Sequence, residues 1–163
     1  MITAIYPGTY DPVTNGHVDV ITRAARVFDR VVVGVVGNPH HKTPMFDVPE
    51  RVAFLEAALE GVENVEVDVF SELVVDFARR WDARAIVKGL RVVSDFESEM
   101  SFALMNRALS EVDTFFLMSD QKYSFVSSSL VKEVFFLGGE VAALVPEPVL
   151  RLMAEKRISL QRR

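Results

Sequence analysis

The sequence predicts one doubly wound, Rossmann-like α/β domain with a five-stranded parallel sheet and helices on both of its faces. Short apolar runs, rich in β-branched and aromatic residues, alternate with longer segments whose apolar residues recur at helical spacing. This alternation is typical of a parallel sheet wrapped by helices. The chain has 163 residues and shows no internal repeat and no linker, so we expect a single domain over residues 1–163.

The expected strands are the short apolar runs at residues 2–6, 31–36, 65–69, 85–87 and 114–118. The second run, VVVGVV, lacks polar alternation and is therefore expected to be covered on both faces. In sheets of this class, ligands bind beyond the carboxyl ends of the strands, near the point where the strand order reverses. The loops after the first and fourth strands are thus the first candidates for a site.

The expected helices cover residues 17–28, 72–81, 95–109, 127–137 and 146–157, with a further helix opening at Asp47. Asp47 and Glu50 have the spacing of a capping box, and Pro49 suits a first helical turn. Four phenylalanines at helical positions are expected in the core: Phe28, Phe54, Phe77 and Phe102. Three acids at the start of the helix at 95–109 are expected to balance its dipole: Asp95, Glu97 and Glu99.

The composition excludes several functions. The chain has no cysteine, which excludes disulfides, thiolate metal sites and cysteine nucleophiles. The N-terminal segment lacks the basic and apolar regions of a signal peptide, and no apolar run is long enough to span a bilayer. We therefore expect a cytoplasmic protein without a membrane partner. The formal net charge of −5 also disfavours nucleic acid as a partner.

The loop after the first strand, PGTYDPVTNGH at residues 7–17, is longer than a plain connection needs. It ends at a predicted helix start near Gly16, where free N–H groups favour phosphate. The helix dipole disfavours the charged form of His17, but a neutral ring can still donate a hydrogen bond, and Thr9 can add a hydroxyl. The other interpretation is that Asp11 and Thr14 form turns and His17 only satisfies local backbone. Both interpretations stay open at this stage.

Three further segments follow strands. Lys88-Gly89-Leu90-Arg91 places two cations at the end of the fourth strand, where a phosphate contact and a solvated loop are both possible. Ser127 to Ser129 lead into a helix, and three serines exceed the one that a cap needs. His40 and His41 lack further ligands for a metal and fit an exposed loop better, although Lys42 lies where it could reach the same crevice.

The candidate residues are mainly hydrogen-bond donors, without an obvious general base or covalent nucleophile. A phosphate that attacks another phosphate is already ionised near neutral pH and needs no base. Charge neutralisation and alignment would then suffice, so the set favours phosphoryl or nucleotidyl transfer over acyl hydrolysis. The sequence lacks a GxxxxGK(S/T) loop, which argues against a P-loop nucleoside triphosphatase.

The motifs also carry a family resemblance. TNGH at residues 14–17 resembles the (H/T)xGH signature of the nucleotidylyltransferase superfamily, and residues 123–129 resemble its distal serine-rich motif. The strings YPGTYDPVTNGH, KGLR, DFESEM, MNR and YSFVSSSLVKEV are similar to the bacterial phosphopantetheine adenylyltransferases. The similarity extends over nearly the whole chain. It implies adenylyl transfer from ATP to 4′-phosphopantetheine by direct in-line displacement, giving dephospho-coenzyme A and pyrophosphate in coenzyme A biosynthesis.

The resemblance also implies a cofactor and an assembly. Mg²⁺ is expected to be carried by the phosphates of ATP, without a metal site of the protein itself. A homohexamer is typical of the family, and feedback by coenzyme A is expected.

Individual roles follow from the matching positions. His17 is implied to stabilise the pentacoordinate α-phosphorus, with Thr9, Lys42 and Arg91 completing the catalytic set. The residues implied to face phosphopantetheine are Thr9, Lys42, Val74, Lys88 and Asn106. The residues implied to hold ATP are Thr9, Tyr10, His17, Gly89, Leu90, Arg91, Glu99, Tyr123, Ser124, Phe125, Val126, Ser127, Ser128 and Ser129.

Two positions depart from the family pattern: Ser98 stands where the family often has tyrosine, and the loop at residues 40–42 is one residue longer than usual. Two alternatives also stay open. A cytidylyl- or nicotinamide-nucleotide transferase shares the same signature, and a nucleotide-binding regulatory module would need the same crevice without turnover.

Overall fold

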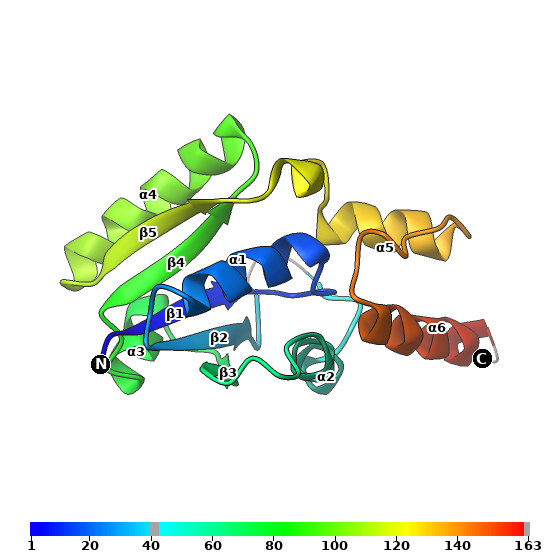
Figure 1. Ribbon diagram of the computed structural model, residues 1–163, viewed down its shortest axis with the longest axis horizontal. Coiled ribbons are helices and arrows are strands. Elements are labelled where there is room, and N and C mark those ends of the chain that lie inside the picture. The colour runs from blue at the N-terminus through cyan, green and yellow to red at the C-terminus, as the bar shows by residue number, and fades with distance from the viewer. Residues whose placement is uncertain (40–42, 162–163) are drawn as a thin grey trace.

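The computed structural model describes residues 1–39 and 43–161, in which five strands form one parallel sheet (Figure 1). The strand order is β3-β2-β1-β4-β5, so the chain builds outward from β1 to β3 and then returns to place β4 on the other side of β1. The strands are β1 (Thr3–Gly8), β2 (Arg30–Val36), β3 (Val65–Phe70), β4 (Ala85–Leu90) and β5 (Asp113–Met118). The predicted fold class is confirmed, and the strand order reverses between β1 and β4.

The helices follow the predicted segments with shifted ends. They are α1 (Asn15–Ala25), α2 (Val48–Ala58), α3 (Val74–Arg80), α4 (Val93–Leu109), α5 (Ser128–Phe136) and α6 (Glu147–Gln161). The capping box at the start of α2 is confirmed: Asp47 accepts a hydrogen bond from the Glu50 N–H at 2.9 Å, and Glu50 reaches back to the Asp47 N–H at 2.8 Å. A short 3₁₀ turn, η1 (Gln121–Tyr123), was not predicted.

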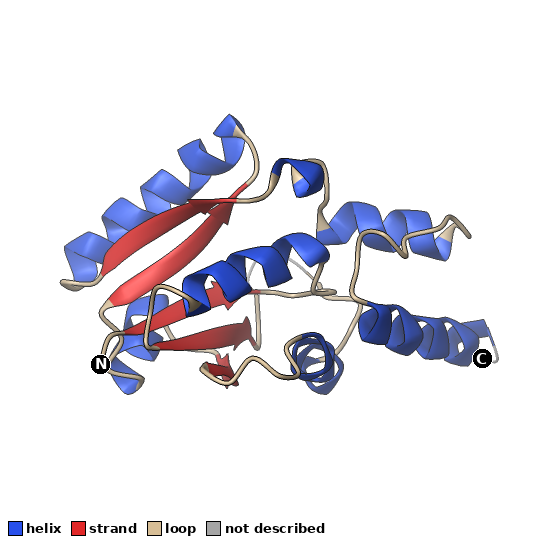
Figure 2. Cartoon of the chain, viewed as in Figure 1, coloured by secondary structure: helices blue, strands red, loops and turns tan. Residues whose placement is uncertain are grey.

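Both faces of the sheet are covered, as successive residues of one strand show. Ala4 and Tyr6 of β1 belong to the core cluster that includes residues of α1 and α2, whereas Ile5 between them packs in a second cluster with α3. The β2 segment at residues 31–35 is fully buried, as expected for VVVGVV. Helices α5 and α6 lie beyond the carboxyl ends of β1 and β2 (Figure 2). They therefore extend the domain beyond the edge of the sheet where the site is expected.

Two predictions about the elements are wrong. Strand β4 does not end at residue 87 but continues through Leu90, because Lys88 to Leu90 pair with Phe116 to Met118 of β5. Only Arg91 of the KGLR segment leaves the strand. Phe102 is 64% exposed and not in the core, whereas Phe54 and Phe77 are buried and Phe28 packs against the core.

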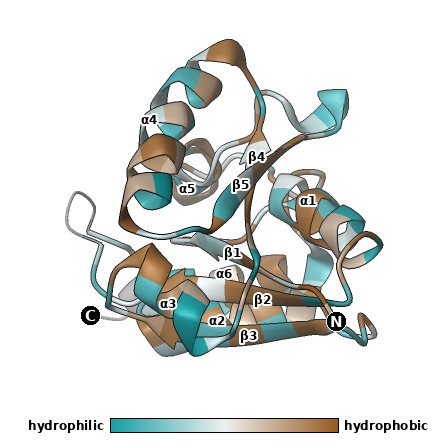
Figure 3. Ribbon diagram, turned by 90° about the vertical axis from the view of Figure 1, so that its left-hand side faces the viewer, coloured by the Kyte–Doolittle hydropathy of each residue, from teal (hydrophilic) through white to brown (hydrophobic). Residues whose placement is uncertain are grey.

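Helix α4 differs from the other helices of the described chain, because none of its residues is buried. Hydrophobic positions recur along it (Figure 3). Its exposed apolar side chains are Val93, Phe96, Met100, Phe102, Leu104, Met105 and Leu109, and those of β5 are Phe115 and Met118. We call these residues the α4–β5 apolar surface. In the described residues, no helix is both long and apolar enough to cross a membrane.

Candidate active site

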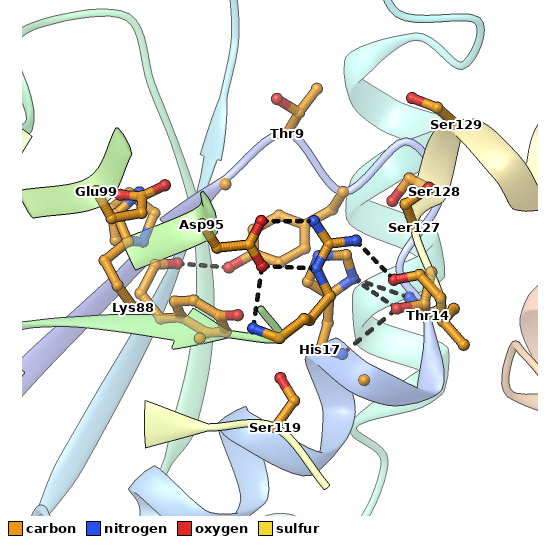
Figure 4. Close-up of a pocket in the computed structure, with 18 of the residues that line it drawn as sticks. Thr9, Thr14, His17, Lys88, Asp95, Glu99, Ser119, Ser127, Ser128 and Ser129 are labelled. Carbon is orange, nitrogen blue, oxygen red and sulfur yellow. Dashed lines mark hydrogen bonds and ion pairs between the residues drawn. The ribbon is translucent and has the colours of Figure 1, made fainter. Parts of the chain in front are cut away.

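A cavity of about 520 Å³ opens at the carboxyl ends of β1 and β4, where the strand order reverses (Figure 4). Its wall is contributed by the loop after β1, the first turn of α1, β4, the first two turns of α4 and the start of α5. This is the location that the sheet topology predicts for a ligand. The predicted site residues that line it are Thr9, Tyr10, His17, Val74, Lys88, Gly89, Arg91, Glu99, Val126, Ser127, Ser128 and Ser129.

Other predicted residues do not line the cavity. Leu90 is buried in the sheet, and Phe125 is 61% exposed. Tyr123 lies beside Gly16, where an added Cβ would come within 3.4 Å of the tyrosine Cβ. Ser124 and Asn106 are also outside the cavity lining. Lys42, like His40 and His41, lies outside the described residues.

His17 sits in the first turn of α1, as predicted, and forms a capping box with Thr14. The His17 N–H donates to the Thr14 hydroxyl at 3.4 Å, and the Thr14 N–H donates to Nδ1 of His17 at 3.0 Å. Since Nδ1 accepts this hydrogen bond, the proton of the neutral ring belongs on Nε2. The two interpretations of His17 therefore combine: one ring nitrogen satisfies local backbone, and the same ring lines the cavity.

The ring of Tyr10 packs against the ring of His17. The two ring centroids are 5.2 Å apart with an interplanar angle of 70°, an edge-to-face contact. The Tyr10 hydroxyl donates to the Tyr6 carbonyl at 2.6 Å, and burial raises the pKa of Tyr10 well above its ordinary value. Gly8 makes room for this ring, because a Cβ at residue 8 would lie 2.9 Å from Cζ of Tyr10. Tyr10 is thus a neutral packing partner and not a base.

A buried charge network lies beneath the loop after β1, and we call Asp11, Arg51 and Lys132 the floor. Arg51 is only 1% exposed and donates to the carbonyls of Thr9 (2.9 Å), Val36 (2.8 Å), Phe46 (3.1 Å) and Gly37 (3.4 Å). Burial lowers the pKa of Arg51, and the carboxylates of Asp11 and Asp47 oppose that shift. Arg51 therefore ties the backbone of Thr9 to the ends of the neighbouring segments.

Asp11 completes the floor from the loop itself. Its carboxylate accepts from the N–H groups of Met45 (3.1 Å) and Phe46 (2.9 Å) and pairs with Lys132 of α5. These contacts join the loop after β1 to the start of α2 and to α5.

Two ion pairs border the opposite part of the cavity, and we call Lys88, Arg91, Asp95 and Glu99 the rim. Lys88 Nζ lies 3.2 Å from a carboxylate oxygen of Glu99. Arg91 donates from Nε and Nη2 to Asp95 at 3.0 and 3.1 Å. Burial opposes ionisation of Asp95, but the hydrogen bonds from Arg91 outweigh it and lower the pKa of this carboxyl. The acids of α4 thus do more than balance its dipole.

The serines at residues 127–129 make different contacts. Ser127 caps α5 by accepting from the Leu130 N–H at 3.2 Å, and Ser128 donates to the Pro12 carbonyl at 2.7 Å. Ser129 lines the cavity beside both (Figure 4). The start of α5 is therefore fixed against the loop that carries Thr9, and two helix N-termini, of α1 and α5, meet the same cavity.

The arrangement suits a phosphorylated ligand. Backbone N–H groups, hydroxyls, one neutral imidazole and two cations line the cavity, and its two carboxylates are both paired with those cations. In the described part of the chain, no three His, Asp or Glu side chains gather closely enough to hold a metal ion.

The sequence did not identify Arg51, Asp11 or the pairing of Asp95 with Arg91 as parts of this site. One signal was present for Arg51: it precedes Phe54 and Leu55 by three and four residues, so it shares the buried face of α2. The ion pair at the rim was also recoverable, because Arg91 and Asp95 are four residues apart at a helix start.

Comparisons with known proteins indicate the family of the chain. A family model described as cytidylyltransferase-like matches residues 5–134. A phosphopantetheine adenylyltransferase from Alkaliphilus metalliredigens is 54% identical over 157 residues, which cover 96% of this chain and 99% of the relative. A phosphopantetheine adenylyltransferase from Heliobacterium modesticaldum is 51% identical over 96% of this chain and 93% of its own length.

A solved structure shows the same fold at lower identity. The chain is similar to a Vibrio parahaemolyticus protein described as a nicotinate-nucleotide adenylyltransferase, with a TM-score of 0.70 and 19% identity. The similarity covers 96% of this chain and 94% of the other. At this identity, the likeness extends to the fold alone.

Proposed function

Since the chain belongs to the phosphopantetheine adenylyltransferase family, we propose that it transfers the adenylyl group of ATP to 4′-phosphopantetheine. The products are dephospho-coenzyme A and pyrophosphate, a step of coenzyme A biosynthesis, which we place in the cytoplasm. Besides the relatives, one observation carries the proposal. A single cavity at the switch point joins the helix N-termini of α1 and α5 to Lys88 and Arg91, a lining suited to several phosphates at once.

The reaction is a direct displacement at the α-phosphorus of ATP. An oxygen of the phosphopantetheine phosphate forms a new P–O bond, and the bond to the oxygen that bridges to the β-phosphorus breaks, so pyrophosphate leaves with that electron pair. A phosphate monoester has its second pKa near 6, so the attacking oxygen is already ionised and gives up no proton. The protein then has to align the two substrates and stabilise the charge that develops at phosphorus.

His17 is the residue we assign to the transferring phosphorus. Its Nδ1 accepts from Thr14, so Nε2 carries the proton and can donate to an oxygen of the α-phosphate. Thr9 lines the same wall, and its backbone is held by Arg51. Arg91 and the segment at residues 127–129 face the triphosphate in this assignment, and Tyr10, Gly89, Glu99 and Val126 line the same cavity. Leu90 and residues 123–125 do not line it and are assigned to the border of the ATP site.

The phosphopantetheine contacts are assigned to the remaining positions. Lys88 is a point charge for the attacking phosphate, and Lys42 is assigned to the same phosphate. Val74 lines the cavity and offers an apolar surface to the pantetheine arm. Asn106 lies outside the cavity lining and is assigned a polar contact with the part of this arm that extends beyond the cavity. Ser98 also lines the cavity. A serine there leaves more room than the tyrosine common in the family.

Mg²⁺ is assigned to the phosphates of ATP. Magnesium keeps several waters and typically binds through substrate phosphates with one or two carboxylates. The two carboxylates that line the cavity, Asp95 and Glu99, are paired with Arg91 and Lys88, so these residues fit an ion that is held by the phosphates of ATP and its own waters. When bound, the ion neutralises charge on the transferring and leaving phosphates.

The α4–β5 apolar surface supports an assembly of several copies. A surface with this many exposed apolar side chains on one helix and one edge strand is typical of a buried contact between chains. We assign it to a homohexamer interface. Light scattering should then give six times the chain mass for the wild type and a smaller mass for Leu104→Asp, and a monomeric wild type would contradict the assignment.

Coenzyme A carries the pantetheine and adenylyl groups of the product, so we expect it to compete for the cavity. Initial rates measured with and without coenzyme A should show inhibition that rising ATP and phosphopantetheine relieve. Inhibition that neither substrate relieves would contradict binding in this cavity.

The activity is tested by identifying products by mass spectrometry. The protein is incubated with Mg²⁺, ATP or CTP, and one acceptor at a time: 4′-phosphopantetheine, nicotinate mononucleotide or nicotinamide mononucleotide. Dephospho-coenzyme A and pyrophosphate, formed only from ATP with phosphopantetheine, are the expected result. A dinucleotide product from either mononucleotide would replace the proposal by the related transferase, and ATP binding without any product would favour a regulatory module.

A further inference from the structure

We propose that Asp95 is the positioning residue that holds Arg91 in its phosphate-binding orientation. The inference rests on the proposed function, because it assumes that Arg91 faces the triphosphate. It begins from a carboxylate in an unfavourable place: Asp95 lines a cavity suited to anions, where its charge repels a phosphate. A residue there needs a role that outweighs this repulsion.

The contacts of Asp95 supply that role. One oxygen, Oδ2, accepts from both the backbone N–H and the Nε–H of Arg91 at 3.0 Å, and Oδ1 accepts from Nη2 at 3.1 Å. This is a two-pronged pairing with the guanidinium together with a bond to the main chain of the same residue. Asp95 therefore fixes both the position and the plane of the Arg91 side chain.

Arg91 also contacts the opposite wall of the cavity. Its Nη1 donates to the Val126 carbonyl at 2.8 Å, directly before Ser127, which caps α5. Three of the five guanidinium N–H groups are used in these bonds, and the other two can donate to a phosphate. Figure 4 shows Asp95 between the side of the cavity that carries Lys88 and Glu99 and the side that carries Ser127.

Glu97 provides a matched control on the same helix. It carries the same charge, is exposed, lies two residues from Asp95 and is absent from the cavity lining. If Asp95 acted only through its charge or through the helix dipole, Asp95→Asn and Glu97→Gln would change ATP affinity in the same direction. A positioning role predicts different directions, because only Asp95→Asn loosens Arg91.

The experiment measures binding of MgATP by titration calorimetry to the full chain and its variants. We expect Asp95→Asn to weaken binding by ~10–100-fold, a loss of the size found when the hydrogen-bond partner that orients a metal ligand is removed. Glu97→Gln should bind as tightly as the wild type or slightly more tightly. Asp95→Glu keeps the charge but displaces it by one methylene, and we expect a loss of about tenfold. An Asp95→Glu or Asp95→Asn protein with wild-type affinity would overturn the inference.

A double-mutant cycle locates the effect. If Asp95 acts through Arg91, the variant with both Arg91→Gln and Asp95→Asn should bind MgATP no more weakly than Arg91→Gln alone. Losses that multiply would overturn the inference. In steady-state assays of Asp95→Asn, the KM for ATP should rise by the same ~10–100-fold, with the KM for phosphopantetheine unchanged within about twofold.

A spectroscopic measurement covers the case in which Asp95→Asn is poorly folded. The Nε–H resonance of Arg91 in the unliganded wild type should be protected from solvent exchange, and a freely exchanging signal would overturn the inference. Failure of the proposed reaction remains distinguishable, because MgATP binding and the Arg91 resonance need no acceptor substrate.

Discussion

Two arginines serve the same cavity in different surroundings. Arg51 in the floor is 1% exposed and donates to four backbone carbonyls, whereas the Arg91 side chain on the rim is 36% exposed and pairs with a carboxylate. Arg51 donates to main-chain carbonyls, whose positions are fixed by the fold, so it is a structural support of the cavity wall. Lys88 and Arg91 on the rim are partly exposed and paired with side chains, so a phosphate can contact them beside their paired carboxylates. Burial thus separates an arginine that shapes the site from one that binds in it.

The largest expected effect is a loss of stability caused by a substitution in the floor. Arg51→Met should lower the free energy of unfolding by about 4 kcal/mol, because it leaves several buried carbonyls without donors. The matched control is Arg151→Met on α6, whose side chain is 70% exposed in a surface ion pair, and we expect a loss below about 0.5 kcal/mol. Urea denaturation measures both. Equal losses for the two variants would contradict the distinction between floor and surface.

The second effect concerns His17, which directly follows the loop after β1 and lines the cavity. His17→Ala should reduce kcat by roughly 100–1000-fold, the usual cost of one donor to a developing oxyanion. The loss of its contact with Thr14 should lower the unfolding free energy by only about 1 kcal/mol. Pyrophosphate release and thermal melting of the same preparation measure the two quantities. A His17→Ala enzyme with near wild-type kcat would remove the histidine from the mechanism.

Much of the fold and of the candidate site could be predicted from the sequence. The alternation of apolar runs predicted the five strands and the helices, and the switch-point rule placed the site at the loops after β1 and β4. Thr14, Gly16 and His17 stand out because a polar loop with glycine and proline leads into a helix. Local patterns suffice where the chemistry depends on neighbours along the chain.

The parts that were missed depend on distant partners. Arg51 was overlooked because a charged residue is normally exposed, and its carbonyl acceptors come from segments that only the fold brings together. The extension of β4 to Leu90 depends on pairing with β5, and the exposure of Phe102 depends on the absence of a covering element within the described chain. Helical spacing predicts a face for a phenylalanine but not what lies against that face.

A third, smaller effect tests whether the rim pairs exchange partners. Lys88→Met should raise the KM for phosphopantetheine by about tenfold, because a charged contact to phosphate is lost. Glu99→Gln leaves Lys88 without its paired carboxylate, so its KM for phosphopantetheine should stay equal or fall by a few-fold. Steady-state kinetics at fixed ionic strength measure both. A rise in KM for Glu99→Gln as large as that for Lys88→Met would show that the pair works as one unit.

The smallest effect is the pH dependence of the Asp95 pair. Arg91 lowers the pKa of Asp95, so the pair contributes its full stability above the ordinary aspartate pKa near 4 and loses it as the pH falls through the lower native value. The difference in unfolding free energy between wild type and Asp95→Asn, about 1 kcal/mol, should be constant from about pH 7 to pH 5 and shrink below about pH 4. Urea denaturation across this range measures it. A difference that already shrinks near pH 6 would contradict the ion pair.

The central claim is that the cavity carries out a direct transfer between two phosphates, with donors and cations but no covalent step on the protein. The configuration at phosphorus tests it most directly. Adenosine 5′-O-(1-thiotriphosphate) of one configuration is converted with 4′-phosphopantetheine, and the configuration of the phosphorothioate in the product is determined by ³¹P NMR. A single in-line displacement predicts inversion. Retention would require an adenylylated intermediate and would contradict the account.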